Sequence, residues 1–353
     1  PLMVLAQGIG ILQAREAMPA LLADSVAFQW ATYLGYTGGM VAIALALGRR
    51  FGLSAGRLGV LLAGLLAIEA VLAMQDADRY WYPAADESDR PRLSLSQESF
   101  ERQQALWDES VHALAPQRPG VRDVYGVVFA PYANEDVFLR ESTMVAEVLE
   151  DRFDAQGRVL QLVNHPTTSD RLPWATPLNL KRAIEAIARR MDRERDLLVV
   201  YLTSHGGSNF KLAAAHWPLQ VDTVSPGELR SMLDQAGVRH RVIAISACYS
   251  GGWVGPLASD TSLVMTAADA DHTSYGCGRR SELTFFGRAL FDEQLRSTWS
   301  FEQAFAAAVP VIRQREVEAR KPDGFSNPQI SVGEKIRPVL QDIARRLERT
   351  PGP

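Results

Sequence analysis

Two stretches of the sequence decide the fold: Tyr201-Leu-Thr-Ser-His-Gly-Gly207 and Val242-Ile-Ala-Ile-Ser-Ala-Cys-Tyr-Ser-Gly-Gly252. Each is an apolar run that ends in one reactive side chain followed by glycines. Continuous apolar runs bounded by glycine are typical of buried strands in a parallel sheet. Open α/β sheets bind their ligands just beyond the carboxyl ends of such strands. The sequence therefore predicts that His205 and Cys248 face one crevice, as a cysteine nucleophile and its base would.

The sequence around these stretches alternates apolar strands with amphipathic helices. We expect strands at Val124–Ala130, Arg158–Val163, Leu197–Leu202, Val242–Ser246, Ser262–Ala267 and Gln329–Val332. We expect helices at Leu139–Phe153, Leu178–Met191, Pro226–Gln235, Ser281–Gln294, Phe301–Glu316 and Glu334–Leu347. This order predicts an α/β fold with a mostly parallel sheet of about six strands and helices on both faces. Lys211–Ala215 and Trp217–Val221 are predicted to pair as a small antiparallel hairpin beyond the sheet edge.

The composition excludes several classes of protein. A net charge of −4 with 22% charged residues argues against a nucleic-acid partner. Only two cysteines occur, so a disulfide framework and a four-cysteine zinc site are excluded. The six histidines follow no metal-binding spacing, and we expect neither a metal nor a cofactor. The length of 353 residues favours more than one unit.

The first 75 residues are far more apolar than the rest. Val26–Leu47 has 22 residues without a charged side chain, and as a helix it would be about 33 Å long, enough to span a bilayer. Leu58–Met74 carries Glu69 and would reach only about 25 Å, so it would need bilayer thinning or a partner helix. Residues 1–13 are also apolar, and because the chain opens on Pro we expect a piece of a longer protein. The alternative is a buried helical hairpin of a soluble domain.

Charged and aromatic residues flank the two apolar segments. Arg49, Arg50 and Arg57 make the loop between them basic, which favours the cytoplasmic side, and the aromatic run at 80–82 is typical of the opposite interface. We therefore expect a multi-pass protein of the inner membrane, in contact with lipid, with a periplasmic catalytic domain. The predicted organisation is a membrane region of two or three helices at 1–75, a linker and helix at 76–120, and the catalytic domain at 121–353.

The motifs at His205 and Cys248 resemble those of a known family. Thr-Ser-His205-Gly and Ser-Ala-Cys248-Tyr-Ser-Gly-Gly are similar to the legumain-like cysteine peptidases of the caspase-like clan, which include asparaginyl endopeptidase and the catalytic subunit of the GPI transamidase. Ala175–Leu180 and Thr266–Cys277 resemble the segment ahead of the family's His strand and one wall of its S1 pocket. The resemblance covers about residues 120–335 and implies a caspase-like sandwich.

The resemblance implies acyl transfer. Cys248 would attack the scissile carbonyl, while His205 would take the thiol proton or protonate the leaving amine. The backbone N–H groups of Gly206 and Cys248 would hold the oxyanion. Asn134 is the counterpart of an asparagine that the family places near its histidine, and capping of the following helix is an equally good explanation of this residue.

The substrate pocket departs from the family pattern. The residue after the nucleophile is acidic in the plant and animal enzymes and is Tyr249 here, whereas Ser274 and Tyr275 match the pocket wall. The family's Arg-His pair falls near Asp136 and Val137. Cleavage after asparagine therefore does not carry over.

Other acidic and sulfur-bearing residues leave the substrate preference open. Asp136, Asp269 or Asp271 would favour a basic P1 residue if they line the pocket, and a solvated surface position is the alternative for each. His272 lies near the predicted pocket. Cys277 has no evident partner and is expected to be a free thiol.

These features together predict a membrane-anchored cysteine endopeptidase that acts on protein or peptide substrates without a cofactor. Two alternatives stay open. The same acyl-enzyme would support transamidation, and the fold alone would serve a non-catalytic membrane adaptor.

Overall fold

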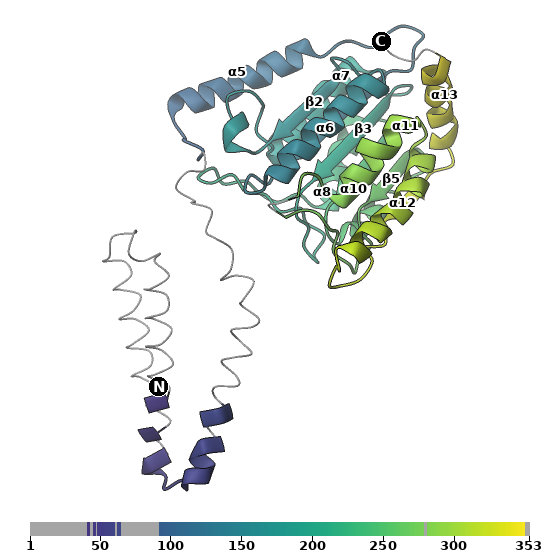
Figure 1. The fold of residues 1–353 in the computed structure, drawn as a ribbon. Coiled ribbons are helices and arrows are strands. Elements are labelled where there is room, and N and C mark those ends of the chain that lie inside the picture. The colour runs from purple at the N-terminus through teal and green to yellow at the C-terminus, as the bar shows by residue number, and fades with distance from the viewer. Residues whose placement is uncertain are drawn as a thin grey trace. The chain divides into compact units, whose positions relative to one another are not determined.

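The computed structural model describes residues 41–42, 45–46, 48–60, 62–64, 92–278 and 281–349 (Figure 1). The chain divides into two compact units, Pro1–Arg90 and Pro91–Pro353. Within the described residues, all strands and both sequence motifs discussed above belong to the second unit. Its first helix, α5 (Gln97–Ala113), packs on this unit, since the Gln103 side chain donates to the carbonyls of Ser169 and Leu172.

The described part of the first unit is a turn between helical residues. Residues 48–50 and 55–60 are helical, and Gly52 lies between them with φ +62°, a left-handed conformation that glycine adopts readily. Arg49, Arg50 and Arg57, which were predicted to form a basic loop, lie in the helical residues on either side of this turn. Most of the two predicted spans lies outside the described residues, as do residues 1–13 and 80–82. Among the residues that the structure describes, no helix has both the length and the apolar character needed to cross a membrane.

A single six-stranded sheet organises the second unit. Its strands, in chain order, are β1 (Val124–Ala130), β2 (Val159–Val163), β3 (Leu197–Thr203), β4 (His240–Ser246), β5 (Ser262–Thr266) and β6 (Gln329–Val332). The spatial order is β2-β1-β3-β4-β5-β6. The first five strands run parallel, and β6 pairs antiparallel with β5. The predicted sheet of about six mostly parallel strands is confirmed.

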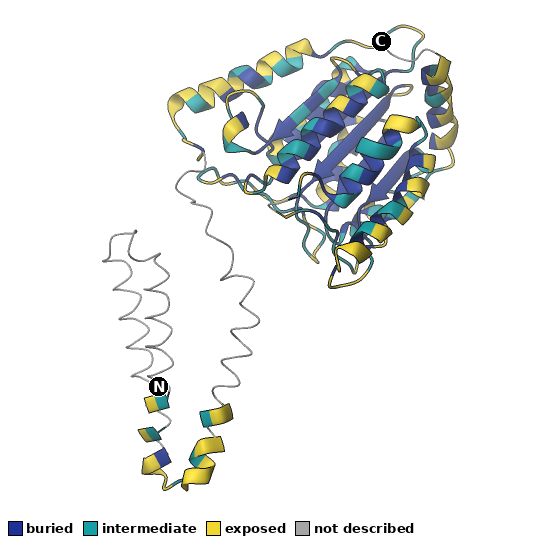
Figure 2. Cartoon of the chain, viewed as in Figure 1, coloured by how far each residue is buried: buried dark blue, intermediate teal, exposed yellow. Residues whose placement is uncertain are grey.

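Helices cover both faces of this sheet (Figure 1). They are α6 (Asp136–Arg152), α7 (Pro177–Arg190), α8 (Pro226–Ala236), α9 (Val254–Leu257), α10 (Phe285–Gly287), α11 (Leu295–Ser297), α12 (Phe301–Glu318) and α13 (Ile336–Arg349). Side chains alternate along β3, so Tyr201 packs in the core beneath α6 and α12 while Val200 packs in the core beneath α7 and α8. Because both faces are covered, β1, β3, β4 and β5 are buried along their whole length (Figure 2).

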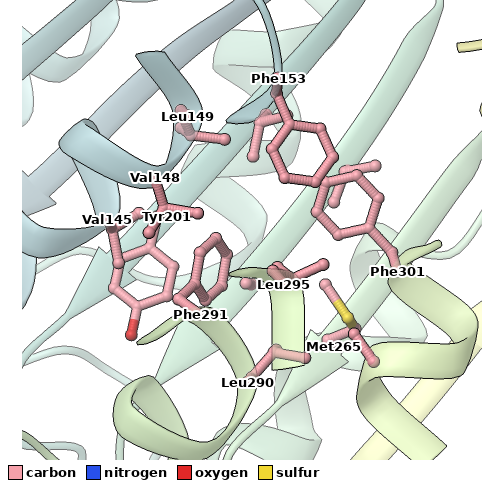
Figure 3. Close-up of a cluster of buried hydrophobic side chains, with 14 of the residues drawn as sticks. Val145, Val148, Leu149, Phe153, Tyr201, Met265, Leu290, Phe291, Leu295 and Phe301 are labelled. Carbon is pink, nitrogen blue, oxygen red and sulfur yellow. The ribbon is translucent and has the colours of Figure 1, made fainter. Parts of the chain in front are cut away.

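Aromatic side chains pack α6 and α12 against one face of the sheet (Figure 3). Phe153 at the end of α6 stacks on Phe301 at the start of α12, with ring centroids 5.0 Å apart. Tyr201 of β3 meets the edge of Phe291 at 4.8 Å. Burying each such ring contributes about 1.5–3 kcal/mol. The contacts hold β3, which leads to His205, in a fixed position between two layers.

The segment after residue 281 differs from its predicted single helix. The turn α10 leads into a π-helix, η4 (Arg288–Gln294), and then into α11. Thr284 starts this segment, because its hydroxyl accepts the Gly287 N–H at 2.9 Å. A Cβ at Gly287 would overlap the Glu141 carboxyl group, so α10 approaches α6 closely. Periodicity alone predicted the helix and could not detect that approach.

The predicted hairpin between Lys211 and Val221 forms only in part. The segment folds back on itself through two isolated antiparallel bridges, Leu212 with Val224 and His216 with Leu219, but it contains no continuous strand. Its backbone bonds go to several partners instead, since the Ala133 N–H, just after β1, donates to the Ala215 carbonyl at 2.8 Å. The loop is thereby tied across the carboxyl ends of the strands.

Candidate active site

The carboxyl ends of β3 and β4 lie side by side at one edge of the sheet. Thr203 and Ser246 are paired in the sheet, and His205 and Cys248 each follow two residues later. A Cβ at Gly206 would overlap the Cys248 carbonyl oxygen, so only glycine allows the two loops to approach this closely. The topology therefore places the imidazole and the thiol on adjoining loops.

Two further glycines let neighbouring loops close on the Cys248 turn. A Cβ at Gly251 would overlap the backbone of Asp269, and one at Gly252 would overlap the ring of Phe210. The Gly251 N–H donates to the Asp269 carbonyl at 3.2 Å. Gly251 and Gly252 thus allow three loops to come into contact. Both lie in a short helix, η3 (Ser250–Trp253), which is only one turn long.

The Cys248 sulfur lies against Ser274. The Ser274 N–H donates to it at 3.3 Å, and the Ser274 hydroxyl and carbonyl oxygens each lie 3.7 Å from it. Interactions with Cys277, Ser274 and the Gly206 N–H outweigh the effect of burial and lower the pKa of Cys248. The lower pKa favours the thiolate, which is the nucleophilic form of cysteine.

His205 lies in an aromatic slot. Its ring meets the edges of Tyr132 and Phe138, with centroids 4.7 Å and 5.1 Å away and nearly perpendicular planes. Burial lowers the pKa of His205, so the imidazole is neutral at pH 7. The two rings fix the imidazole plane by packing. Tyr132 lies just beyond the end of β1, and the reasoning that located His205 at a strand end would have located it too.

Two backbone N–H groups at this junction have no backbone acceptor. The bridge between Gly206 and Leu212 uses the Gly207 N–H and the His205 carbonyl, and leaves the Gly206 N–H directed at the sulfur. In the described backbone the Cys248 N–H also donates to no carbonyl. Both residues are half-buried, and their N–H groups are the two that the sequence predicted to hold an oxyanion.

Tyr249 adopts a strained backbone conformation beside the nucleophile. Its φ is +55°, in the left-handed region that a tyrosine rarely occupies. The Tyr249 N–H donates to the His272 carbonyl at 2.9 Å. Asp269 accepts from His272 Nδ1 at 2.8 Å and from the Asn327 amide at 2.9 Å. Asp269 and His272 are therefore used to build the loop that holds the Cys248 turn.

The predicted pocket residues separate into two groups. Ser274 contacts the Cys248 sulfur, and Tyr275 follows it with its ring 5.3 Å from that of Phe285. Asp136 is exposed and pairs with His165 Nε2 at 3.1 Å and with Arg140 at 3.6 Å.

Asn134 lies apart from both groups. It is exposed and makes no hydrogen bond to His205 in the described residues. Glu135 is the N-cap of α6, so Asn134 does not cap this helix either.

A buried carboxyl group lies beneath the crevice. Glu141 of α6 is fully buried and accepts from the Tyr201 and Thr203 hydroxyls, each at 2.7 Å, and from the Thr284 N–H at 2.8 Å. The Thr284 hydroxyl in turn bonds that of Ser246 at 3.0 Å. This network joins the ends of β3 and β4 to α6 and α10. The sequence offered no signal for it, because a single Glu on an amphipathic helix is normally exposed.

Cys277 was expected to be a free thiol, and it forms no disulfide in the structure. Across the described part of the chain, no group of three or more His, Cys, Asp and Glu side chains is placed to hold a metal ion.

Comparison with known proteins adds a family relationship. Residues 181–331 match the sequence model of the Peptidase C13 family, and this stretch contains His205, Cys248 and Cys277. The chain is accordingly a cysteine-type peptidase, and the predicted resemblance to the legumain-like peptidases is confirmed over that segment. A search of curated proteins finds no match. Among solved structures the chain is similar to caspase-1 from Spodoptera frugiperda, with 15% identity and a TM-score of 0.44 over 62% of this chain and 92% of that one.

Proposed function

We propose that this chain is a membrane-anchored endopeptidase in which Cys248 is the nucleophile and His205 its acid–base partner. The observation that carries the proposal is the close approach of the Gly206 backbone, next to His205, to Cys248, with the Ser274 N–H donating to the Cys248 sulfur at 3.3 Å. A buried cysteine that only fills a core has its pKa raised by burial, whereas the pKa of Cys248 is lowered. Perturbation in this direction at a crevice is typical of a reactive thiol.

The first half of the reaction is acylation. The Cys248 thiolate attacks the scissile carbonyl carbon, and the N–H groups of Gly206 and Cys248 bind the resulting oxyanion. The imidazolium form of His205 protonates the amine as the peptide bond breaks. Loss of one oxyanion donor typically lowers the rate by about 10²–10³.

The second half is deacylation. His205, now neutral, removes a proton from water, which attacks the thioester and releases the acid. An amine in place of water would give transamidation on the same acyl-enzyme. Tyr249, Ser274 and Tyr275 are proposed to contact the substrate. Tyr249 directly follows Cys248 in the chain, Ser274 contacts the Cys248 sulfur, and Tyr275 directly follows Ser274.

A peptide-library cleavage assay tests this function. We expect cleavage with a defined P1 preference, loss of turnover in His205→Ala, and kcat/KM highest on the acidic side of neutrality. The thiolate of Cys248 increases as the pH rises through about 6, while the imidazolium of His205 is lost as the pH rises through a pKa that burial has lowered. An unchanged rate in His205→Ala would contradict the dyad. Mass spectrometry of products formed with an added amine distinguishes hydrolysis from transamidation.

The membrane part of the proposal rests on the length and apolar character of Val26–Leu47 and on the basic turn after it. We expect the chain to stay in the membrane fraction after alkaline extraction. In bacterial cells with a permeable outer membrane, a membrane-impermeant thiol reagent should label Cys248 from the periplasmic side. Recovery of the intact chain in the soluble fraction would contradict the anchor, and labelling only after lysis would contradict the orientation.

A further inference from the structure

The last strand of the sheet brings a distant part of the chain to the candidate site. β5 ends at Thr266 and β6 begins at Gln329, and these two residues are paired in the antiparallel register. The loop after β5 (the wall loop, residues 267–275) and the loop before β6 (the support loop, residues 319–328) therefore lie at the same end of the sheet. The wall loop carries the N–H that donates to the Cys248 sulfur.

Four hydrogen bonds tie the wall loop to the support loop. Thr273 donates its N–H, at 2.9 Å, and its hydroxyl, at 2.6 Å, to one carboxylate oxygen of Asp323. The Asp269 N–H donates to the Ser326 carbonyl, and the Asn327 amide donates to the Asp269 carboxylate, each at 2.9 Å. The wall loop is thus held from the side opposite the nucleophile.

Asp323 is itself held by a buried cation. The Lys321 side chain is only 1% exposed, and its ammonium donates to the other carboxylate oxygen of Asp323 and, at 2.7 Å, to the Gly324 carbonyl. A buried ammonium needs a charged partner, so Asp323 is held in place. Burial raises the pKa of Asp323, but hydrogen bonds from Lys321 and Thr273 outweigh it and lower the pKa overall. The carboxylate therefore stays ionised wherever a cysteine titrates.

The support loop is anchored to α12 independently of the wall loop. Glu316 of α12 is 3% exposed and accepts the Ser326 N–H at 2.9 Å, while its carbonyl accepts the Lys321 N–H at 3.0 Å. The Arg313 guanidinium lies over the Phe325 ring, 4.3 Å from its centroid. These contacts make the support loop a fixed point for the chain that passes the nucleophile.

The position of Thr273 in the chain links Asp323 to the sulfur. Thr273 directly precedes Ser274, whose N–H donates to Cys248 at 3.3 Å. Asp323 fixes both the N–H and the side chain of Thr273. Because the backbone has only two soft dihedrals per residue, the ψ angle of Thr273 is then the one rotation left to orient the Ser274 N–H.

We propose that Asp323 is a positioning residue, which fixes the wall loop so that the Ser274 N–H stays directed at the Cys248 sulfur. This inference rests on the proposed function, since it concerns the same nucleophile. The competing explanation is that the ion pair of Asp323 with Lys321 stabilises the support loop alone.

The test is the pH dependence of Cys248 alkylation by iodoacetamide in the whole chain, with mass spectrometry to separate the peptides of the two cysteines. Asp323→Ala removes the acceptor from Thr273, so the Ser274 N–H can turn away from the sulfur. Loss of one hydrogen bond to a charged group corresponds to about one pH unit. The midpoint of the profile should therefore rise by about one unit, which makes alkylation about tenfold slower at a pH below both midpoints.

Asp260→Ala is the control for the loss of an Asp–Lys pair beside the same two strands. Asp260 pairs with Lys335 at 2.8 Å near the opposite ends of β5 and β6, and both side chains are exposed. We expect this variant to keep the profile of the unmodified protein. An unchanged profile in Asp323→Ala, or an equal displacement in Asp260→Ala, would overturn the inference.

Thr273→Val tests the same contact and leaves the ion pair intact. Valine lacks the hydroxyl, so one of the two bonds to Asp323 is lost and the midpoint should rise by a smaller amount. In a double variant with Asp323→Ala it should add nothing, because both changes remove one contact, and additive displacements would overturn the inference. If Asp323→Ala does not fold with Lys321 left unpaired, Thr273→Val takes its place, and an unchanged profile there has the same meaning.

Alkylation reports on the sulfur whether or not any peptide is cleaved. A profile that depends on Asp323, in a protein that cleaves no peptide, would support this inference and contradict the proposed function. Peptide cleavage with a profile that is independent of Asp323 would do the reverse.

Discussion

Cys248→Ala is expected to lower kcat by about 10⁴–10⁶-fold, the range found when a nucleophile of an acyl-transfer site is removed. The reason is that the variant lacks the thiolate that is proposed to form the acyl-enzyme. Turnover of a cleavable peptide measures the loss, and circular dichroism confirms that the fold is kept.

A thiol-reactive peptide probe provides the control for this variant. The unmodified protein should be labelled at Cys248, and Cys248→Ala should not be labelled. Labelling that persists in Cys248→Ala, or that transfers to Cys277, would contradict the assignment of the nucleophile.

Glu141→Ala is expected to lower the free energy of unfolding by about 3–5 kcal/mol. The substitution leaves three buried donors without their acceptor: the Tyr201 hydroxyl, the Thr203 hydroxyl and the Thr284 N–H. It also removes the packing against Gly287, where α10 approaches α6. Chemical denaturation monitored by fluorescence measures the change.

Two variants on the same helix sharpen this measurement. Glu147 is exposed two turns further along α6, and Glu147→Ala should change stability by no more than about 0.5 kcal/mol. Glu141→Gln should lie between the two. Its amide oxygen can accept from Thr284 while its NH₂ group faces two hydroxyls, which can accept as well as donate. A loss in Glu141→Ala no larger than that in Glu147→Ala would contradict a structural role for this network.

Most of the fold could be predicted because burial leaves a clear pattern. The apolar runs of β1, β3, β4 and β5 are continuous since both faces are covered, and their bounds differ from prediction by two residues at most. Where the prediction from the sequence pattern failed, a tertiary contact sets the local conformation instead. The segment at Phe285–Gln294 carries a helical period, but its start is set by Thr284 and by the buried Glu141.

The sequence by itself determined the positions of His205 and Cys248 at the ends of adjacent strands, because strand ends and glycines are local signals. Only the tertiary structure decided what surrounds them. Tyr132 and Phe138 pack against the imidazole, and Ser274 contacts the sulfur, from segments distant in the chain. Contacts of this kind depend on which loops the sheet order β1-β3-β4-β5 brings to one edge. A single sequence records the residues of such a site, and the folded sheet decides which of them meet.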